Sequence, residues 1–360
     1  MASVITFLTR TKGSADGSSK YGAQDIVAYA YLLLGILIIL VPVIWTVISS
    51  FKPDEAIESF DTRLLPYDQI EQTIDGVGNK AIYNWRDQEG VEQQVFKAGP
   101  TRTLTDVATP ENPTDILKAP RKELSPAEEI RVATENYLDP LLQRNGQKYF
   151  NISLLLWNSI FVTVVATLIT LLINSMAAFA LSKYQFKGRL TFTLLIVATL
   201  LIPNTIILVS LFFVVWSFGI FGSLWGVIIP AAATPTGVFL LRQYMLTIPD
   251  ELLEAARMDA ASEWRIYWRI VLPLSLPALS VLAILSVIWR WNDFLWPLIV
   301  LISDPSSHTI QIGLTTFSGE FDQDHHYILA MTVVSLIPIT LVFVWLQRFI
   351  TTGIATTGLK

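Results

Sequence analysis

The chain has 360 residues, of which 52% are hydrophobic and only 15% are charged. An ordinary soluble domain carries roughly 25% charged residues, so this composition indicates a membrane protein. The formal net charge of −5 argues against a nucleic-acid partner. The absence of cysteine excludes disulfides, thiolate metal sites and a cysteine nucleophile.

Long stretches without any charged residue divide the chain. They cover residues 26–51, 149–182, 190–241, 270–289 and 327–347. The third stretch exceeds the roughly 20 apolar residues that one membrane helix needs, and Gly219 and Gly222 favour a turn within it. The first stretch is too long for a typical signal peptide and is taken as a true span. Continuous apolar blocks disfavour a β-barrel. We therefore expect six membrane helices near residues 27–50, 154–181, 190–215, 223–244, 271–297 and 328–348.

The distribution of Lys and Arg predicts the orientation in the membrane. These residues gather in segments 1–25, 183–189 and 242–270, and Arg348 and Lys360 lie at the C-terminus, whereas the short loops 217–222 and 298–326 contain none. We expect a multi-pass protein of a bacterial or archaeal cytoplasmic (inner) membrane with both termini in the cytoplasm. We expect residues 1–25 to form a Ser/Gly-rich cytoplasmic tail and residues 349–360 to form a cytoplasmic C-terminal tail.

Residues 51–150 form an insert that this orientation places outside the cell. It carries 12 Lys or Arg and 18 Asp or Glu. The run Ala81–Phe96 contains turn residues between β-prone segments and predicts a hairpin. The run Ser125–Gln143 starts with Pro and acidic residues, which is typical of a helix N-terminus. We expect a small folded insert with a modest core.

The loop between the fourth and fifth spans, residues 249–273, has the most informative pattern. Pro249 predicts a helix start, and two acidic residues follow it where the helix dipole favours them. Leu252, Ala255, Ala256 and Asp259 are spaced to share one helix face. Such a short amphipathic helix either docks on a partner protein or rests on lipid headgroups, and its periodicity does not decide between the two.

The same loop resembles the EAA loop of ATP-binding-cassette (ABC) importer permeases. The family pattern is Glu-Ala-Ala, two variable residues, Asp-Gly-Ala, then an aromatic residue and Ile-x-Leu-Pro. The matching positions are Glu254, Ala255, Ala256, Asp259, Ala261, Tyr267, Ile270, Leu272 and Pro273. Ala260 departs from the family glycine, so it is strained or the turn differs if that glycine has a positive φ.

Further segments resemble the carbohydrate permeases similar to the MalG subunit of the maltose system. They are Trp157-Asn158-Ser159, the run 177–189, the run 291–297 and the C-terminal run 347–360. The resemblance covers about residues 30–50 and 150–360. The enlarged loop after the first span is similar to that of the α-glucoside branch. The implied fold is all-α, with six transmembrane helices of the MetI-like type I importer permease fold, residues 151–348 forming a five-helix core.

This resemblance also implies partners and a division of labour. The chain would form half of a translocation path for an oligosaccharide or glucoside, with a homologous permease subunit as the other half. A cytoplasmic ABC ATPase dimer would bind ATP and Mg²⁺, and an extracytoplasmic solute-binding protein would deliver the sugar. The chain itself has no P-loop, so it is expected to hold no cofactor and to be no enzyme.

The resemblance assigns roles to residues in two loops. The ATPase-coupling candidates are Leu252, Glu254, Ala255, Ala256, Asp259 and Ala260. The loop 298–326 is expected to reach toward the binding protein. Its contact candidates are Gly313, Thr315, Thr316, Ser318 and Gly319.

Polar residues inside the spans have two interpretations. Arg290 and Asp293 either form an i,i+3 ion pair in an aromatic belt or line the sugar path beside tryptophan rings. The substrate-path candidates are Asn204, Trp291, Asn292 and Asp293. Pro203 and Pro235 should kink their helices.

Two other features of the sequence lead to alternatives. Asp322, Asp324, His325 and His326 could suggest a metal site, but adjacent histidines rarely converge on one ion, so a solvated loop is expected. The competing functions are a secondary transporter and a membrane-embedded enzyme working without an ATPase. Internal repeats would favour the former and convergent carboxylates and histidines the latter, and neither pattern is seen.

Overall fold

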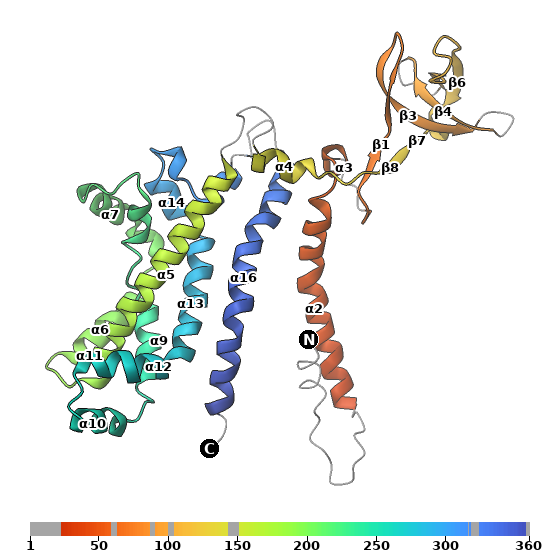
Figure 1. The fold of residues 1–360 in the computed structure, drawn as a ribbon. Coiled ribbons are helices and arrows are strands. Elements are labelled where there is room, and N and C mark those ends of the chain that lie inside the picture. The colour runs from red at the N-terminus through yellow and green to blue at the C-terminus, as the bar shows by residue number, and fades with distance from the viewer. Residues whose placement is uncertain are drawn as a thin grey trace.

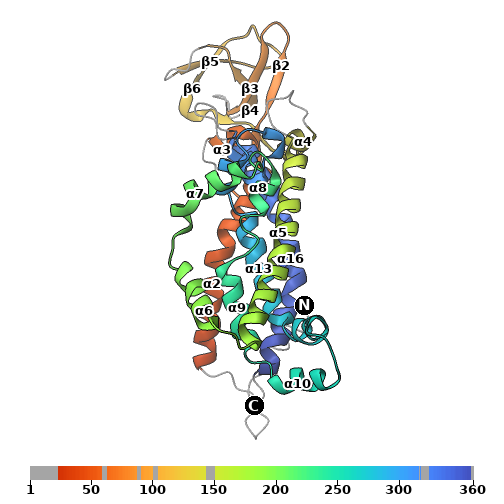
Figure 2. The ribbon, with the colours of Figure 1, turned by 90° about the vertical axis from the view of Figure 1, so that its left-hand side faces the viewer.

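The computed structural model describes residues 23–58, 63–86, 91–99, 104–142, 151–315, 317 and 324–357. Within this part, long helices run side by side, and a β-sheet domain stands at one end of them (Figure 1). The helix α10 lies at the opposite end (Figure 2). The insert and the predicted coupling loop are therefore separated by the full length of the helices.

The helices account for most of the described chain. In chain order they are α2 (Ala23–Ser49), α3 (Asp54–Glu58), α4 (Glu135–Leu142), α5 (Ile152–Lys183), α6 (Arg189–Thr199), α7 (Asn204–Ser217), α8 (Leu224–Ile228), α9 (Pro235–Met245), α10 (Asp250–Met258), α11 (Glu263–Ile266), α12 (Leu272–Leu274), α13 (Leu276–Trp291), α14 (Leu295–Val300), α15 (Ile310–Thr315) and α16 (His325–Thr357). A π-helical turn, η2 (Tyr267–Val271), joins α11 to α12, and short 3₁₀ turns are η1 (Arg121–Glu123) and η3 (Pro305–Ser307).

Three described helices are long and apolar enough to cross a membrane, namely α2, α5 and α16. The segments Glu263–Leu274 and Leu276–Trp291 pass the same test as a pair, bent by 75°. The expected third and fourth spans are each split, because Pro203 precedes α7 and Pro235 begins α9. Beyond the predicted end of the last span, α16 continues to Thr357, so most of the expected C-terminal tail is helical.

The split spans produce two apolar cores along α5. One cluster includes Val162, Ala166, Val215 and Trp296 and packs α7, α8 and α14 against the half of α5 nearer Ile152. The second cluster, called the inner core below, includes Phe179 and packs α9, α10 and α13 against the half nearer Lys183. The turn predicted at Gly219 and Gly222 is present, with φ of 69° and 77°. Helix α16 packs between α13 and α2 (Figure 1), and the apolar side chains of α2 are largely exposed.

The insert contains a sheet, so the expectation of an all-α protein is wrong for this region. Its strands are β1 (Tyr67–Gln69), β2 (Glu71–Ile74), β3 (Gly78–Arg86), β4 (Glu92–Lys97), β5 (Leu104–Ala108), β6 (Leu117–Pro120), β7 (Ser125–Pro126) and β8 (Glu128–Ile130). Strands β2 to β6 are neighbours in chain order, β7 pairs with β3, and β1 pairs with β8. The hairpin expected over Ala81–Phe96 is present as β3 and β4, with Ile82 opposite Phe96.

The prediction that a helix starts at Ser125 is wrong. Residues 125–130 form β7 and β8, and a helix begins only at Glu135. Two small cores, one around Phe96 and one around Trp85, cover the two faces of the sheet. The buried Asn136 side chain of α4 donates to the carbonyls of Ser50 and Lys52, each at 2.9 Å, and so joins the insert to the end of α2.

Candidate functional site

Helix α10 is fastened to the end of α5 by a buried lysine. Lys183, the last residue of α5, has a side chain that is only 3% exposed. Its Nζ donates to the Ile248 carbonyl at 2.5 Å and to Asp250 Oδ1 at 2.7 Å. Because Asp250 is the first residue of α10, this contact fixes the start of the helix against the membrane core.

The two faces of α10 differ from what the spacing alone predicts. Leu253 is 1% exposed and packs with Ala256 against the inner core, so Ala256 faces the permease itself. Leu252 is 45% exposed and Met258 is 87% exposed. Ala255 lies between them on the outward side and is also exposed. The surface available to a partner is therefore an apolar ridge of Leu252, Ala255 and Met258.

Acidic side chains flank this ridge. Glu254 and Asp259 are both exposed. An ionised carboxylate only accepts hydrogen bonds, so a partner surface must present donors to these groups.

Ala260 carries the backbone strain that a glycine would avoid. Its φ is 56°, and among the described residues it is the only one other than glycine with a positive φ. Its backbone N–H donates to Arg257 O at 3.0 Å, which ends α10 in a left-handed turn. The sequence left two possibilities for Ala260, a strained residue or a different turn, and the structure shows the strained left-handed conformation.

An ion pair closes the loop after α10. Arg257 Nε donates to Glu263 Oε1 at 2.8 Å, and the Tyr184 hydroxyl donates to Glu263 Oε2 at 2.5 Å. Burial and the Glu263 carboxylate raise the pKa of Tyr184 to about 12, and the same carboxylate raises the pKa of Arg257. Arg257 therefore pairs within the chain.

The residues expected along the substrate path fall into different environments. Trp291 is 4% exposed, and its Nε1 donates to Ser335 O at 3.0 Å, so its ring is part of the core rather than a lining. Asn292 is exposed and donates to Ile288 O at 2.8 Å, while Asp293 is half-buried. Asn204 begins α7, and its side chain lies outside the described part of the chain.

Arg290 does not pair with Asp293 in the way that the spacing suggests. No ion pair joins the two among the described residues. Arg290 Nη2 instead donates to Thr170 Oγ1 at 2.5 Å and to Ala231 O at 2.7 Å. The guanidinium thus connects α13 to α5 and to the break between α8 and α9.

The loop 298–326 is partly a packing element. Gly313 is buried, and a Cβ placed on it would come within 2.4 Å of Leu155 Cδ1, so the expectation that Gly313 contacts a binding protein is wrong. Thr315 is exposed. The other three contact candidates, Thr316, Ser318 and Gly319, lie outside the described residues.

One histidine at the start of α16 has a partner on another helix. His326 Nδ1 lies 2.6 Å from Asp54 Oδ1, which links α16 to α3. Asp324 and His325 form no metal-like group with other described residues. Asp322 lies outside the described part.

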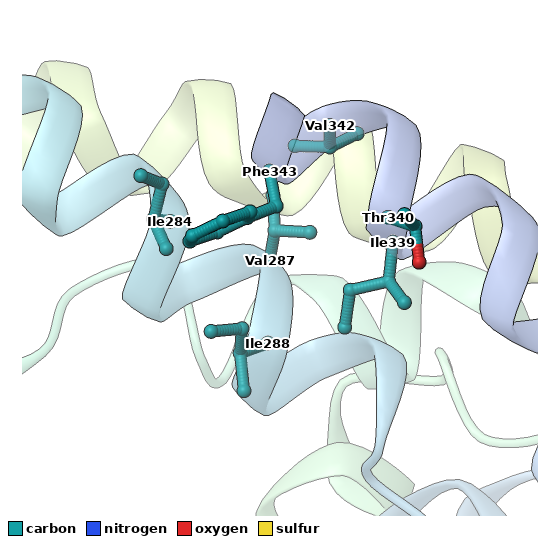
Figure 3. A pocket seen from close by; sticks show the side chains of 7 residues that line it. All are labelled: Ile284, Val287, Ile288, Ile339, Thr340, Val342 and Phe343. Carbon is teal, nitrogen blue, oxygen red and sulfur yellow. The ribbon is translucent and has the colours of Figure 1, made fainter. Parts of the chain in front are cut away.

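An apolar hollow between α13 and α16 offers no polar recognition (Figure 3). Its lining consists of Ile284, Val287, Ile288, Ile339, Thr340, Val342 and Phe343. The Thr340 hydroxyl donates to Leu336 O at 2.8 Å. The hollow therefore suits hydrocarbon rather than a sugar.

The sequence reasoning missed the polar side of α5. Its buried polar residues are Asn158, Ser159, Thr163, Thr167, Thr170, Asn174, Ser175 and Ser182. Most are spaced by three or four residues, so they share one helix face. This spacing within a charge-free span was the signal that could have revealed them.

Comparison with known proteins identifies the family. Residues 171–356 match the family described as the binding-protein-dependent transport system inner membrane component. The chain belongs to this family. It is a permease subunit of an ABC importer, and ATP hydrolysis in such importers resides on a separate subunit.

The matches with three relatives cover most of each relative's length. The arabinooligosaccharide transport permease AraQ of Halalkalibacterium halodurans is 38% identical over 203 residues, covering 56% of this chain and 72% of the relative. AraQ of Bacillus subtilis is 32% identical, covering 66% and 86%. The sn-glycerol-3-phosphate permease UgpE of Brucella abortus is 33% identical, covering 70% and 89%.

A solved structure shares the fold of the permease. A chain of a bacterial ABC transporter involved in importing the acidic polysaccharide alginate matches with a TM-score of 0.63 and 21% identity. The match covers 92% of this chain and 99% of that chain. The permease therefore has the fold of type I ABC importer permeases.

Proposed function

We propose that this permease imports an oligosaccharide or glucoside as half of a translocation path, with a homologous permease as the other half. The relatives named for arabinooligosaccharides support a sugar as the solute. The exposed apolar side chains of α2 suit lipid or a second membrane subunit. A solute-binding protein would deliver the sugar on the side of the β-sheet domain.

We further propose that α10 couples the permease to a cytoplasmic ATPase that holds ATP and Mg²⁺. The observation that carries this proposal is the exposed ridge of Leu252, Ala255 and Met258 on a helix whose other face is anchored by Leu253 and Lys183. A helix that only rested on lipid would need no such anchoring to the end of α5. Because α10 is fixed to the end of α5, a movement of a partner bound to α10 would be passed to the helices of the core.

The topology that follows has six spans, with the split helices α6–α7 and α8–α9 each counted as one. Both termini and α10 would lie in the cytoplasm, and the β-sheet domain would lie outside. The Lys and Arg residues of segments 183–189 and 242–270 support this orientation.

Affinity purification and uptake assays with a panel of solutes together test the proposed importer function. The tagged permease should co-purify an ATPase and a second permease, and membranes should take up a labelled oligosaccharide or glucoside only with ATP and a binding protein. Purification of the chain alone with full uptake would refute the importer. Uptake of an unrelated solute through the same complex would refute only the substrate class.

A further inference from the structure

The middle of α5 carries a layer of buried polar side chains between the two apolar cores. Thr170 is 1% exposed and Asn174 is 0% exposed. Near them, the Thr167 hydroxyl lies 2.9 Å from the Ser286 hydroxyl of α13, and the Ser175 hydroxyl lies 2.7 Å from that of Tyr267. Such groups are costly in the interior of a membrane protein unless each one has a partner.

The break between α8 and α9 explains why polar groups gather here. In a continuous helix, the carbonyl of Ala231 would accept from the N–H of residue 235. That residue is Pro235, which has no N–H. Asn174 satisfies the neighbouring position, since its Oδ1 accepts from Thr234 N at 3.1 Å and its Nδ2 donates to Thr234 Oγ1 at 2.8 Å.

Arg290 supplies the donor that Pro235 cannot. Its Nη2 donates to Ala231 O at 2.7 Å, and the Thr170 hydroxyl donates to the same carbonyl at 3.3 Å. A charged side chain costs more to bury in a membrane protein than a neutral donor does, so a neutral donor would be favoured if hydrogen bonding to one carbonyl were all that was needed. The long guanidinium side chain, however, links three elements at once: α13, α5 and the break.

The break is also close to α10 along the chain. Helix α9 begins at the break and ends at Met245, and α10 starts at Asp250. Along the chain, a displacement of α10 reaches the break through α9, while α8 on the other side packs with α14. A hydrogen bond between the break and α13 links this movement directly to the end of the fifth span.

We propose that Arg290 is a positioning residue for transport, which holds the Ile229–Thr234 break open and joins it to α5 and α13. The inference uses transport as one readout and so rests on the proposed function. It concerns the chain's own hydrogen bonds, however, and can be tested without knowing the solute.

The first experiment compares Arg290→Met with Ser286→Ala in the full importer. Ser286 is a matched control because its hydrogen bond also joins α13 to α5 but does not reach the break. Arg290→Met should lower the uptake rate about tenfold or more, because it cuts the link between α13 and the break and leaves Ala231 O with only the longer bond from Thr170. Ser286→Ala should stay within about twofold, and Arg290→Lys should recover part of the loss. Equal uptake in Arg290→Met and Ser286→Ala would overturn the proposal.

The second experiment measures backbone hydrogen exchange of residues 229–241 in the same complexes in nanodiscs. Arg290→Met should speed exchange there, while exchange in α16 stays unchanged. Pro235→Ala restores an N–H for Ala231 O, so the Pro235→Ala/Arg290→Met double variant should regain slow exchange but not uptake, because the break is then closed. A double variant that exchanges as fast as Arg290→Met would overturn the assignment. If the wild type carries no sugar, the proposed function fails, and the exchange rates still decide the role of Arg290.

Discussion

The strained turn at Ala260 offers a direct test of the local structure after α10. Placing a residue other than glycine in the left-handed region costs roughly 1–2 kcal/mol. A glycine in its place loses about 0.5–1 kcal/mol of backbone entropy on folding. Ala260 is exposed at φ 56°, so Ala260→Gly sacrifices little packing and should stabilise the permease by about 0.5–1 kcal/mol.

Thermal unfolding of the purified permease in detergent measures this effect. Ala260→Gly should raise the midpoint by about 1–2 °C. Ala255→Gly is the matched control, because Ala255 is equally exposed but lies within α10, where glycine costs about 0.8–1.0 kcal/mol. Ala260→Val should destabilise, since a β-branched side chain fits the left-handed region worst. A lower midpoint for Ala260→Gly, or the same sign for both glycine variants, would refute the reasoning.

Three further outcomes are expected. Ala255→Asp should abolish co-purification of the ATPase while the permease keeps its unfolding midpoint, whereas Ala256→Asp should lower the midpoint because it places a charge against the inner core. Asn136→Ala should destabilise the junction of the insert by about 1–3 kcal/mol, seen as faster proteolysis of the β-sheet domain, because two buried carbonyls lose their donor. An impermeant maleimide added outside intact cells should label a cysteine at Lys118 and not one at Met258, and the reverse pattern would invert the topology.

The sequence motif predicted the position of α10 but not which of its faces is buried. Leu252 and Leu253 are adjacent and equally apolar, so periodicity alone placed Leu252 and Ala256 together. The contact of Leu253 with the inner core depends on α5, which is distant in sequence, and on how α9 and η2 fold back against it. The strain at Ala260 could be anticipated because alanine stands where the family pattern has glycine, and glycine is the residue that readily adopts a positive φ.

Helix breaks and the insert were harder to predict for a different reason. A run without charges indicates that a segment lies in lipid, but it does not indicate whether that segment is one continuous helix. The splits before α7 and at α9 were therefore visible in the sequence only as isolated prolines. The start of Ser125–Gln143 reads as a helix N-terminus. The edge of β3 and the strand β1, however, offer hydrogen-bond partners to residues 125–130, and this tertiary pairing overrides local preference.

The ends of the β-sheet domain leave and re-enter the rest of the chain side by side. Tyr67 faces Ile130 across the β1–β8 pair, and Arg131 N donates to Pro66 O at 3.0 Å. Two chain ends one strand spacing apart can be bridged by a tight turn. The domain is therefore a modular unit that can be removed or exchanged without rebuilding the helices, and a permease of this architecture can gain or lose this β-sheet module in a single genetic event.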